Sequence, residues 1–468
     1  QFVSLPDWTP GSYTIRDHVQ NLFSISAFQG NKEINLSRKS TSLWLINLEK
    51  LDPIEIKYKI VARDLTVRTC YLDSEFASLC LPALILRIEE KNDCNHYLTL
   101  NIPKPWKSYI PLIGKNPYIA KNYDELVDAP IHCGNLRLET INVNSFSHKI
   151  VFIGEHNDIN NKVIIDIEKI CIATTKLMNT IQPSKGNYMF IIQLFLDSYG
   201  GLEHDNSSVI QYCWNKFKSR NGYRKFLQLI GHEYLHQWNV RRLRPKEYKN
   251  YDYNKAVISE GLWFAEGATS YYDIFLPYIS GISSEDELLS DLSTLISRYL
   301  NSPGRYIQSL SDSSKEAWIK LYKSNDSSID NQISYYCLGA LTCLSLDIYL
   351  RKADSSLANL LRTLWNNKSI LNKGYSRSDI LFELNKISPD LLPRLVKWLD
   401  EPDSLNLYED LKLIGISIKS TKIKNTISGL KIIDTNGICK ITRVETNSIF
   451  MKCGLVPGDI LLAINKYK

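Results

Sequence analysis

One stretch constrains this chain more than any other. Residues 223–242 contain the order His-Glu-x-x-His among apolar residues at helical spacing. His232 and His236 are four positions apart, so on a helix they share a face, with Glu233 beside them, and both imidazoles can reach one cation. No Gly or Pro interrupts residues 233–243, and Pro245 is expected to end the helix. The spacing predicts a buried helix that carries part of a zinc site.

A third ligand has to come from elsewhere, because catalytic zinc takes three protein ligands and leaves one position for water. Glu266 is the main candidate. It follows His236 by 30 positions (266 − 236) and lies in an aromatic stretch, 262–272, that predicts a second helix. Glu260 is the alternative, but it precedes Gly261 and is expected on a loop or a first turn. His-Glu-x-x-His also occurs by chance in unrelated helices, and the added carboxylate favours one zinc ion.

Length and composition narrow the classes of protein. A chain of 468 residues is too long for one core, and 44% hydrophobic with 23% charged residues is typical of globular protein. The net charge of +6 is small and scattered, which argues against a nucleic-acid partner. No run of 18 apolar residues predicts a membrane span, and no signal peptide is visible, although a leader before Gln1 stays open.

Ten cysteines are present without any Cys-x-x-Cys pair. Small apolar cysteines are common in protein cores, so reduced thiols and a cytoplasmic location are expected. An exported, disulfide-bonded enzyme is the alternative.

The first 122 residues have short alternating runs rich in β-branched and aromatic residues, separated by turn residues. These runs are 43–48, 54–61, 65–71, 84–88 and 97–102. We expect a β-sandwich-like domain over residues 1–122. A rigid aromatic loop at 5–13 either packs between domains or walls a substrate cleft.

From residue 123 the pattern becomes mostly helical. Strands are expected at 149–153 and 188–196, a short turn at 197–204, and helices at 162–181, 285–300, 334–352, 355–366, 378–387 and 389–399. This predicts a second domain over residues 123–405. Strand-like runs at 413–418, 430–433 and 438–444 then predict a small β module over residues 406–468 that looks incomplete.

Two further groups could act beside the metal. Gly200 and Gly201 would let substrate backbone approach a sheet edge, and Glu203 could pair with a free amino terminus, which would favour an aminopeptidase. A simple tight turn with a solvated Glu203 is equally compatible with the spacing. Tyr335 and Tyr336 could each donate a hydrogen bond to an oxyanion, although tyrosines more often serve packing.

Taken together, these motifs resemble the glycyl-aminopeptidase family of zinc metallopeptidases, which have a thermolysin-like catalytic domain, an N-terminal β domain and a C-terminal PDZ domain. The resemblance covers nearly the whole chain and depends on residues 5–13, 123–130, 199–204, 232–245, 263–272 and 454–465.

The resemblance implies a zinc ion held by His232, His236 and Glu266, with Glu233 as general base. It implies that Gly200, Gly201 and Glu203 bind the substrate, with His204 as a further donor in the cleft or a support for Glu203. It favours Tyr336 over Tyr335, because Tyr336 stands three before Gly339 as in a Tyr-x-x-Gly placement. It also implies that residues 406–468 are a PDZ-like module without its usual final helix and strand.

The sequence therefore predicts a multidomain α+β zinc peptidase, most simply an aminopeptidase that acts on peptides or proteins. A zinc endopeptidase is the first alternative. The second is an inactive scaffold that binds partners through the PDZ-like module. A peptide ligand of a complete PDZ domain and a homo-oligomer stay open as partners.

Overall fold

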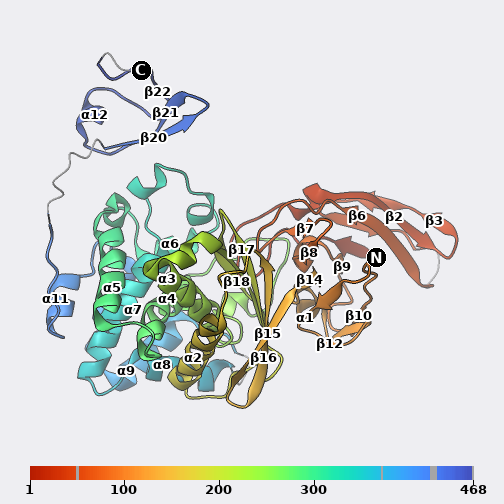
Figure 1. Cartoon of the computed structure of the whole chain (residues 1–468), viewed down its shortest axis with the longest axis horizontal. Helices are drawn as coiled ribbons and strands as arrows, with labels where there is room; N and C mark the ends of the chain where they lie inside the picture. Colours follow the sequence, from red (N-terminus) through yellow and green to blue (C-terminus); the bar gives the residue numbers. More distant parts are fainter. Residues whose placement is uncertain (49–51, 370–372, 422–428, 466–468) are drawn as a thin grey trace. The chain divides into compact units, whose positions relative to one another are not determined.

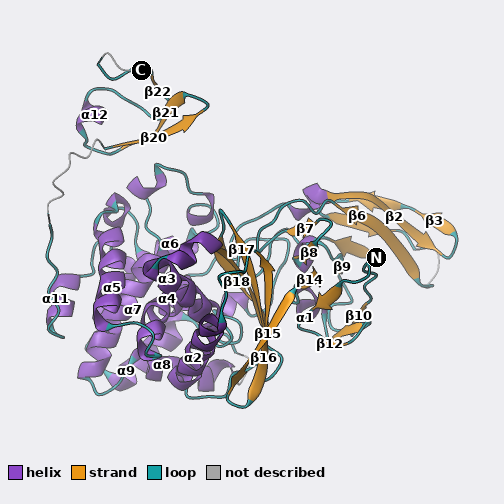
Figure 2. Cartoon of the chain, viewed as in Figure 1, coloured by secondary structure: helices purple, strands orange, loops and turns teal. Residues whose placement is uncertain are grey.

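The computed structural model of the chain describes residues 1–48, 52–369, 373–421 and 429–465 (Figure 1). Strands dominate up to β19 and helices dominate from α3 to α11, as Figure 2 shows. The described residues group into two compact units, one of residues 1–257, 272–288 and 361–375, the other of residues 258–271, 289–360 and 376–468. The mixed α+β class is confirmed. The domain boundaries and the finer sandwich-like and thermolysin-like descriptions stay predictions.

The first unit begins with four small antiparallel sheets, of strand order β4-β5-β1-β9, β3-β2-β6, β10-β13-β12 and β11-β14-β8-β7. Their strands are β1 Phe2–Ser4, β2 Leu22–Gln29, β3 Lys32–Ile34, β4 Leu36–Arg38, β5 Leu43–Ile46, β6 Ile54–Ile60, β7 Cys70–Leu72, β8 Phe76–Leu79, β9 Arg87–Ile88, β10 His96–Leu98, β11 Lys107–Tyr109, β12 Ile113–Gly114, β13 Tyr118–Ala120 and β14 Ile131–Gly134. Helix α1, Tyr123–Val127, packs its apolar residues into the core shared by the last of these strands. The expected N-terminal β region is confirmed.

Three predicted strands in this part, at 65–71, 84–88 and 97–102, are mostly wrong. Of the run 97–102 only the first two residues are extended, as the end of β10. Within 65–71 the hydroxyls of Thr66 and Thr69 lie 2.7 Å apart and hold a tight turn, so only the end of the run is extended. Within 84–88 the chain first completes the 3₁₀ turn Leu81–Ala83, which leaves two residues for β9. At 65–71 and 84–88 local hydrogen bonds take up backbone groups that a ladder would need.

A five-stranded sheet follows, of order β15-β16-β17-β19-β18. Its strands are β15 Arg137–Val143, β16 Phe146–Gly154, β17 Met189–Phe195, β18 Tyr199–Glu203 and β19 Ser207–Cys213. The central pairs β16–β17 and β17–β19 are parallel, and helix α2, Asn161–Met178, makes the crossover from β16 to β17. The buried apolar run of β17 is what a central parallel strand requires.

Strand β18 lies at the edge of this sheet. It pairs antiparallel with β19, with Gly201 opposite Ile210 and Glu203 opposite Ser208. The expectation of a short turn at 197–204 is therefore wrong, because most of these residues form extended backbone. An edge strand presents unpaired backbone groups along its outer side, which makes it a template for a further chain.

Helix α3, Arg220–Leu235, is the predicted histidine helix, and it is shorter than expected. It begins at the N-cap Ser219, whose side chain accepts a hydrogen bond from the backbone of Gly222. It ends with His236 as C-cap, nine residues before Pro245 (245 − 236), so Pro245 does not end it. The backbone turns directly after the second histidine, which fixes where that imidazole points.

The second unit is mainly helical. The helices that lie wholly or partly in it are α4 Leu262–Ile279, α5 Glu285–Leu300, α6 Leu310–Lys315, α7 Tyr335–Lys352, α8 Leu357–Leu364, α9 Arg377–Ile387, α10 Leu391–Asp400 and α11 Leu407–Lys412. A stretch around α7, Ser328–Lys352, is long and apolar enough to match a membrane span by composition, but 83% of its most apolar window is buried inside the protein. This burial is typical of a core helix.

Two glycines let α4 and α7 approach each other at backbone distance. A Cβ on Gly267 would lie 2.7 Å from the Cα of Gly339, closer than side chains allow. Small residues at a crossing permit this contact, whereas larger ones would separate the helices. The crossing brings Glu266, next to Gly267, toward the first turn of α7, where Tyr335 begins the helix.

The C-terminal described residues form a small sheet of order β20-β21-β22, with β20 Leu430–Thr435, β21 Ile438–Val444, helix α12 Ile449–Lys452 and β22 Ile460–Leu461. The expected strand at 413–418 is wrong: this run begins as the end of α11, and Gly415 turns the chain with a φ of 79°. The PDZ-like identity of this sheet stays a prediction.

Candidate active site

The two histidines of α3 have their inner ring nitrogens fixed by neighbours. Nδ1 of His232 lies 2.9 Å from Oδ2 of Asp273, and Nδ1 of His236 lies 2.6 Å from the carbonyl oxygen of Asn239. A carboxylate and a carbonyl can only accept, so both Nδ1 atoms donate and both Nε2 atoms keep a lone pair. This is the arrangement that prepares a pair of imidazoles for a metal ion.

Glu266 and Asp273 belong to the same helix, α4, and are seven positions apart. Positions seven apart share a helix face, so Glu266 lies on the stripe that carries the partner of His232. One ligand atom from each of His232, His236 and Glu266 can be chosen so that all three lie within 4.8 Å of one another. Two imidazole nitrogens and one carboxylate oxygen fit a divalent cation. Glu260 precedes the helix, as expected, and Lys315 lies 3.6 Å from its Oε2.

Asp273 is a residue that sequence reasoning missed. Burial raises the pKa of its carboxyl, and the neighbouring His232 opposes that shift. The seven-residue spacing from Glu266 was a usable signal, because it is visible in the printed sequence. What the sequence did not show is that His232 faces the side of α4 that carries Glu266 and Asp273.

Glu233 lies directly beneath the edge strand. A Cβ on Gly201 would meet Oε1 of Glu233 at 1.8 Å, so any side chain at this position would have to displace the Glu233 carboxylate. The same region brings Glu203 close, because ligand atoms of Glu203, Glu233 and His236 also lie within 4.8 Å of one another. Gly201 and Glu203 are two apart on β18 and therefore point to the same face of the sheet.

Glu203 is buried, with 4% of its surface exposed, and its Oε1 has no hydrogen-bond partner among the described residues. The loop at residues 5–13 lies against it: a Cβ on Gly11 would come within 2.6 Å of Oε2 of Glu203. Gly11 has a φ of 84°, so both the backbone and the space at this position require glycine. A solvated Glu203, the alternative to a functional one, is wrong.

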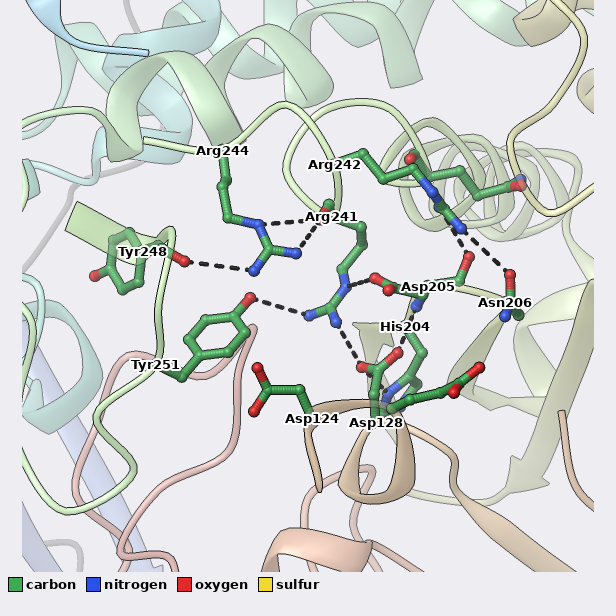
Figure 3. A network of polar contacts seen from close by, with 12 residues as sticks. Asp124, Asp128, His204, Asp205, Asn206, Arg241, Arg242, Arg244, Tyr248 and Tyr251 are labelled. Atoms are coloured by element: carbon green, nitrogen blue, oxygen red, sulfur yellow. Dashed lines mark hydrogen bonds and ion pairs between the residues drawn. The ribbon is translucent and has the colours of Figure 1, made fainter. Parts of the chain in front are cut away.

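His204 points the other way, because successive side chains alternate along a strand. Its Nδ1 lies 3.1 Å from Oδ1 of Asp128, and its Nε2 is buried without a partner among the residues described. Figure 3 shows this pair within a larger network, in which Arg241 contacts Asp128 at 2.7 Å and Asp205 at 2.8 Å. The backbone N–H of Asp205 closes the network by donating to Oδ2 of Asp128 at 2.7 Å.

The basic group at residues 241–244 completes this network from inside the protein. Arg242 donates to the backbone oxygen of Asp205 at 3.0 Å, and the guanidinium of Arg244 stacks 4.9 Å from the centre of the Tyr251 ring. Burial alone would raise the pKa of Asp205, but the three arginines outweigh burial and hold it below its ordinary value. These arginines form part of an internal polar network.

A cavity of about 610 Å³ borders the network. Its lining is polar and includes residues of both charges, among them Lys121, Asp124, His204 and Arg241. The cavity therefore lies behind the strand that carries Glu203, on the His204 side.

The two tyrosines at the start of α7 stack on each other with ring centres 4.6 Å apart. Tyr335 is fully buried, and burial raises its pKa well above the ordinary value, with Tyr322, Tyr336 and the carboxylate of Glu266 adding to the shift. The hydroxyl of Tyr336 lies 3.1 Å from that of Tyr322. The negative charge of Glu266 therefore acts on the hydroxyl of Tyr335. Tyr336 is the less buried of the two tyrosines.

Comparisons with known proteins agree with this architecture. The family model for the M61 glycyl aminopeptidase matches residues 225–342, and the model for the N-terminal domain of the same family matches residues 1–135. A search of curated proteins finds no match.

Among solved structures, an aminopeptidase N family protein from Idiomarina loihiensis is similar over 99% of this chain and 84% of its own, with 29% identity and a TM-score of 0.93. An M1 zinc metallopeptidase from Deinococcus radiodurans has 10% identity, 87% coverage of both chains and a TM-score of 0.54. Aminopeptidase A of Legionella pneumophila, in complex with aspartic acid, has 11% identity and a TM-score of 0.55 over 86% of this chain and 45% of its own. The last two show a shared fold. On the matches of both family models, the chain is a peptidase that belongs to the M61 glycyl aminopeptidase family.

Proposed function

We propose that this peptidase is a zinc-dependent aminopeptidase. The observation that carries the proposal is the pair of fixed Nδ1 atoms on His232 and His236, which leaves both Nε2 lone pairs for a cation that the nearby carboxylate of Glu266 completes. Two nitrogens and one oxygen are the ligands of catalytic zinc, which keeps a further position for water. The M1 zinc metallopeptidase with the same fold supports the choice of zinc.

Zinc held there would supply acidity to a bound water and polarise the carbonyl that is attacked. Glu233 accepts the proton of the attacking water and returns it to the leaving amine, so one residue serves as base and then as acid. Its position against Gly201 supports this role, because a chain lying along the edge of β18 would pass directly over its carboxylate.

Glu203 binds the free amino terminus of the substrate. A buried carboxylate with an unpartnered oxygen is costly, and an ammonium group would offset that cost. The loop at Gly11 covers one side of Glu203 and leaves little room for substrate residues that would extend past this carboxylate. His204 supports the end of β18 from the opposite face through Asp128, as its contacts indicate. Gly200 and Gly201 let the substrate backbone approach the edge strand.

Tyr336 donates a hydrogen bond to the oxyanion, with Tyr335 as the alternative. The lower burial of Tyr336 supports its access to substrate, whereas the coupling of Tyr335 to Glu266 supports the other choice. If Tyr336 is the donor, Tyr336→Phe is expected to lower kcat by about 10²–10³-fold with little change in KM, whereas Tyr335→Phe should change kcat little. The reverse result would identify Tyr335 as the donor.

A cytoplasmic location is proposed with the function. All ten cysteines are unpaired in the structure, and seven of them are buried. Reduced thiols of this kind are usual in reducing compartments.

The test combines metal analysis with matched substrates. Purified protein is expected to contain one zinc per chain and to hydrolyse glycyl peptides that have a free amino terminus. Glu233→Gln should abolish turnover while zinc stays bound, because the three ligands remain. Glu203→Gln, which keeps the shape and removes the charge, should lower cleavage of free peptides far more than that of acetylated ones.

Equal loss on free and acetylated peptides would favour the endopeptidase alternative. Retention of near wild-type turnover in Glu233→Gln would remove Glu233 from the chemistry. A zinc-loaded wild type that cleaves none of these peptides would favour the inactive scaffold.

A further inference from the structure

Arg68 reaches the edge strand from a rigid turn. Val67, the residue before it, is buried in the core shared with Leu202 and Val209 under the five-stranded sheet. The hydroxyl of Thr66 accepts the backbone N–H of Arg68 at 3.1 Å and fixes the turn. From this anchored turn Arg68 reaches β18, where its Nη2 donates to the carbonyl oxygen of Gly201 at 3.0 Å.

The charge of Arg68 is not compensated. Its Nε is buried and lacks a hydrogen-bond partner, and no carboxylate in the part of the chain that the structure describes forms an ion pair with its guanidinium. Other inward-facing arginines differ: Arg241 contacts Asp128 and Asp205, and Arg224 contacts Glu287. A partly buried guanidinium without a counter-charge is an incomplete site, and a carboxylate is the group that its fork of donors fits.

Arg68 stands at a defined distance from the proposed amino-terminus site. It contacts Gly201, and its Nη1 lies 4.0 Å from where a Cβ on Gly200 would be, so it is two to three residues from Glu203 along β18. At about 3.4 Å per residue this is roughly 7–10 Å. An extended dipeptide or tripeptide spans about the same length between its amino nitrogen and its carboxylate.

A substrate that enters with its amino terminus at Glu203 runs antiparallel to β18 and passes Gly201, where Glu233 lies, before it reaches Gly200. Nη1 of Arg68 lies 4.0 Å from where a Cβ on Gly200 would be, one residue beyond Gly201, so this end of the guanidinium lies on the leaving side of the bond to be cleaved. Whatever Arg68 binds belongs to the leaving part of the peptide.

We propose that Arg68 forms a carboxylate subsite that selects di- and tripeptides by their free carboxyl terminus. This inference rests on the proposed aminopeptidase function and adds a preference for short peptides. Arg68 is here a specificity-determining residue, and the substrate uses the Nη donors that are left over after the bond to Gly201.

The test compares kcat/KM for Gly-Ala and Gly-Ala-Ala with kcat/KM for the same peptides as carboxyl-terminal amides. The wild type is expected to prefer the acids by about 10–100-fold, mainly through KM, as one charge-assisted contact allows. Arg68→Gln keeps a donor for Gly201 and removes the charge, so it should erase this preference and leave the amides unchanged. Arg68→Lys should retain part of it. Arg63→Ala, an exposed arginine five residues earlier, is the matched control and should behave as wild type.

Two further substrates show whether Arg68 recognises the carboxyl terminus of a short peptide or any carboxylate. Gly-Asp-amide offers a side-chain carboxylate, and a five-residue glycyl peptide with a free carboxyl terminus offers one that lies too far away. Selection by a side-chain carboxylate alone would overturn the proposal, and so would an equal loss on acids and amides in Arg68→Gln, which would make Arg68 a support for β18.

A binding experiment with an inactive variant tests the carboxylate subsite separately from the proposed aminopeptidase function. In the Glu233→Gln background, Gly-Ala should bind about 10–100-fold more tightly than Gly-Ala-amide by calorimetry, and Arg68→Gln should remove the difference. If the wild type cleaves neither peptide but this difference is found, the function fails and the subsite stands. If both are cleaved and bound equally, the subsite fails and the function stands.

Discussion

The carboxylate of Glu233 lies against the backbone of Gly201, so that a Cβ at Gly201 would be 1.8 Å from Oε1 of Glu233. A residue of the histidine helix and a residue of the edge strand are thus in direct contact, although they are 32 positions apart (233 − 201). The contact sets the spacing between strand and helix at the point where the proposed base has to act.

Gly201→Ala should therefore displace the Glu233 carboxylate or push β18 outward. We expect a loss of about 10²-fold or more in kcat, since a shift of about 1 Å at a reacting group has this effect. Stability should fall less than activity. Gly186→Ala is the control, because a Cβ there has no neighbour closer than 3.6 Å. Steady-state kinetics and thermal melts of both variants check this, and a Gly201→Ala enzyme with wild-type kcat would contradict it.

Asp273→Asn should weaken the metal site without touching a ligand. The neutral amide can still accept from Nδ1 of His232 but no longer increases the basicity of the imidazole, so zinc affinity should fall about 10–100-fold. Competition with a chromophoric chelator measures this directly. Asp166→Asn, which removes a carboxylate paired with Lys162 on α2, should leave zinc affinity unchanged. Equal affinities for wild type and Asp273→Asn would show that this contact does not tune the site.

Arg241→Met should be strongly destabilising. Arg241 is 3% exposed and contacts Asp128 and Asp205, whose side chains are 12% and 42% exposed. Its loss leaves the largely buried Asp128 carboxylate without its guanidinium partner and should cost about 3 kcal/mol of unfolding free energy. Arg377→Met, which breaks a more exposed pair with Asp400, should cost about 1 kcal/mol or less. Denaturant unfolding of the two variants compares them, and similar losses would contradict the buried-pair account.

Acid should destabilise the protein below pH 6.5 through buried histidines. Burial lowers the pKa of His132 to about 3 and that of His148 and His18 to about 4. Between pH 6.5 and about 4 the unfolded chain binds these protons and the folded chain does not, so the free energy of unfolding falls as the pH falls. Each such proton contributes a slope of about 1.4 kcal/mol per pH unit.

His132→Leu should reduce that slope, because both ring nitrogens of His132 are buried without partners among the described residues and the apolar side chain has no proton to bind. At pH 7.5 the variant should be about as stable as wild type. Unfolding curves at pH 7.5, 6 and 5 give the slope. A variant as acid-sensitive as wild type would exclude His132 as a contributor.

Most helices and much of the proposed metal-ligand set could be predicted because their signals are local. The run that became α5 was predicted at its observed limits, since apolar spacing and an acidic first turn are printed in the sequence. The same local reasoning failed at 65–71 and 413–418, where apolar residues looked like strands but side-chain hydroxyls or a positive-φ glycine turned the backbone. Periodicity cannot report a turn that is closed by hydrogen bonds.

The sequence by itself determined the histidine pair, the proposed base between them and a carboxylate at a workable distance, because helix geometry alone puts residues four or seven apart on one face. Only the tertiary structure decided that 199–203 is an edge strand, that Asp273 holds His232, and that Arg68 meets Gly201 with no counter-ion among the residues the structure describes. Strand pairing and charge compensation depend on which distant segments pack together, and no local pattern encodes that choice.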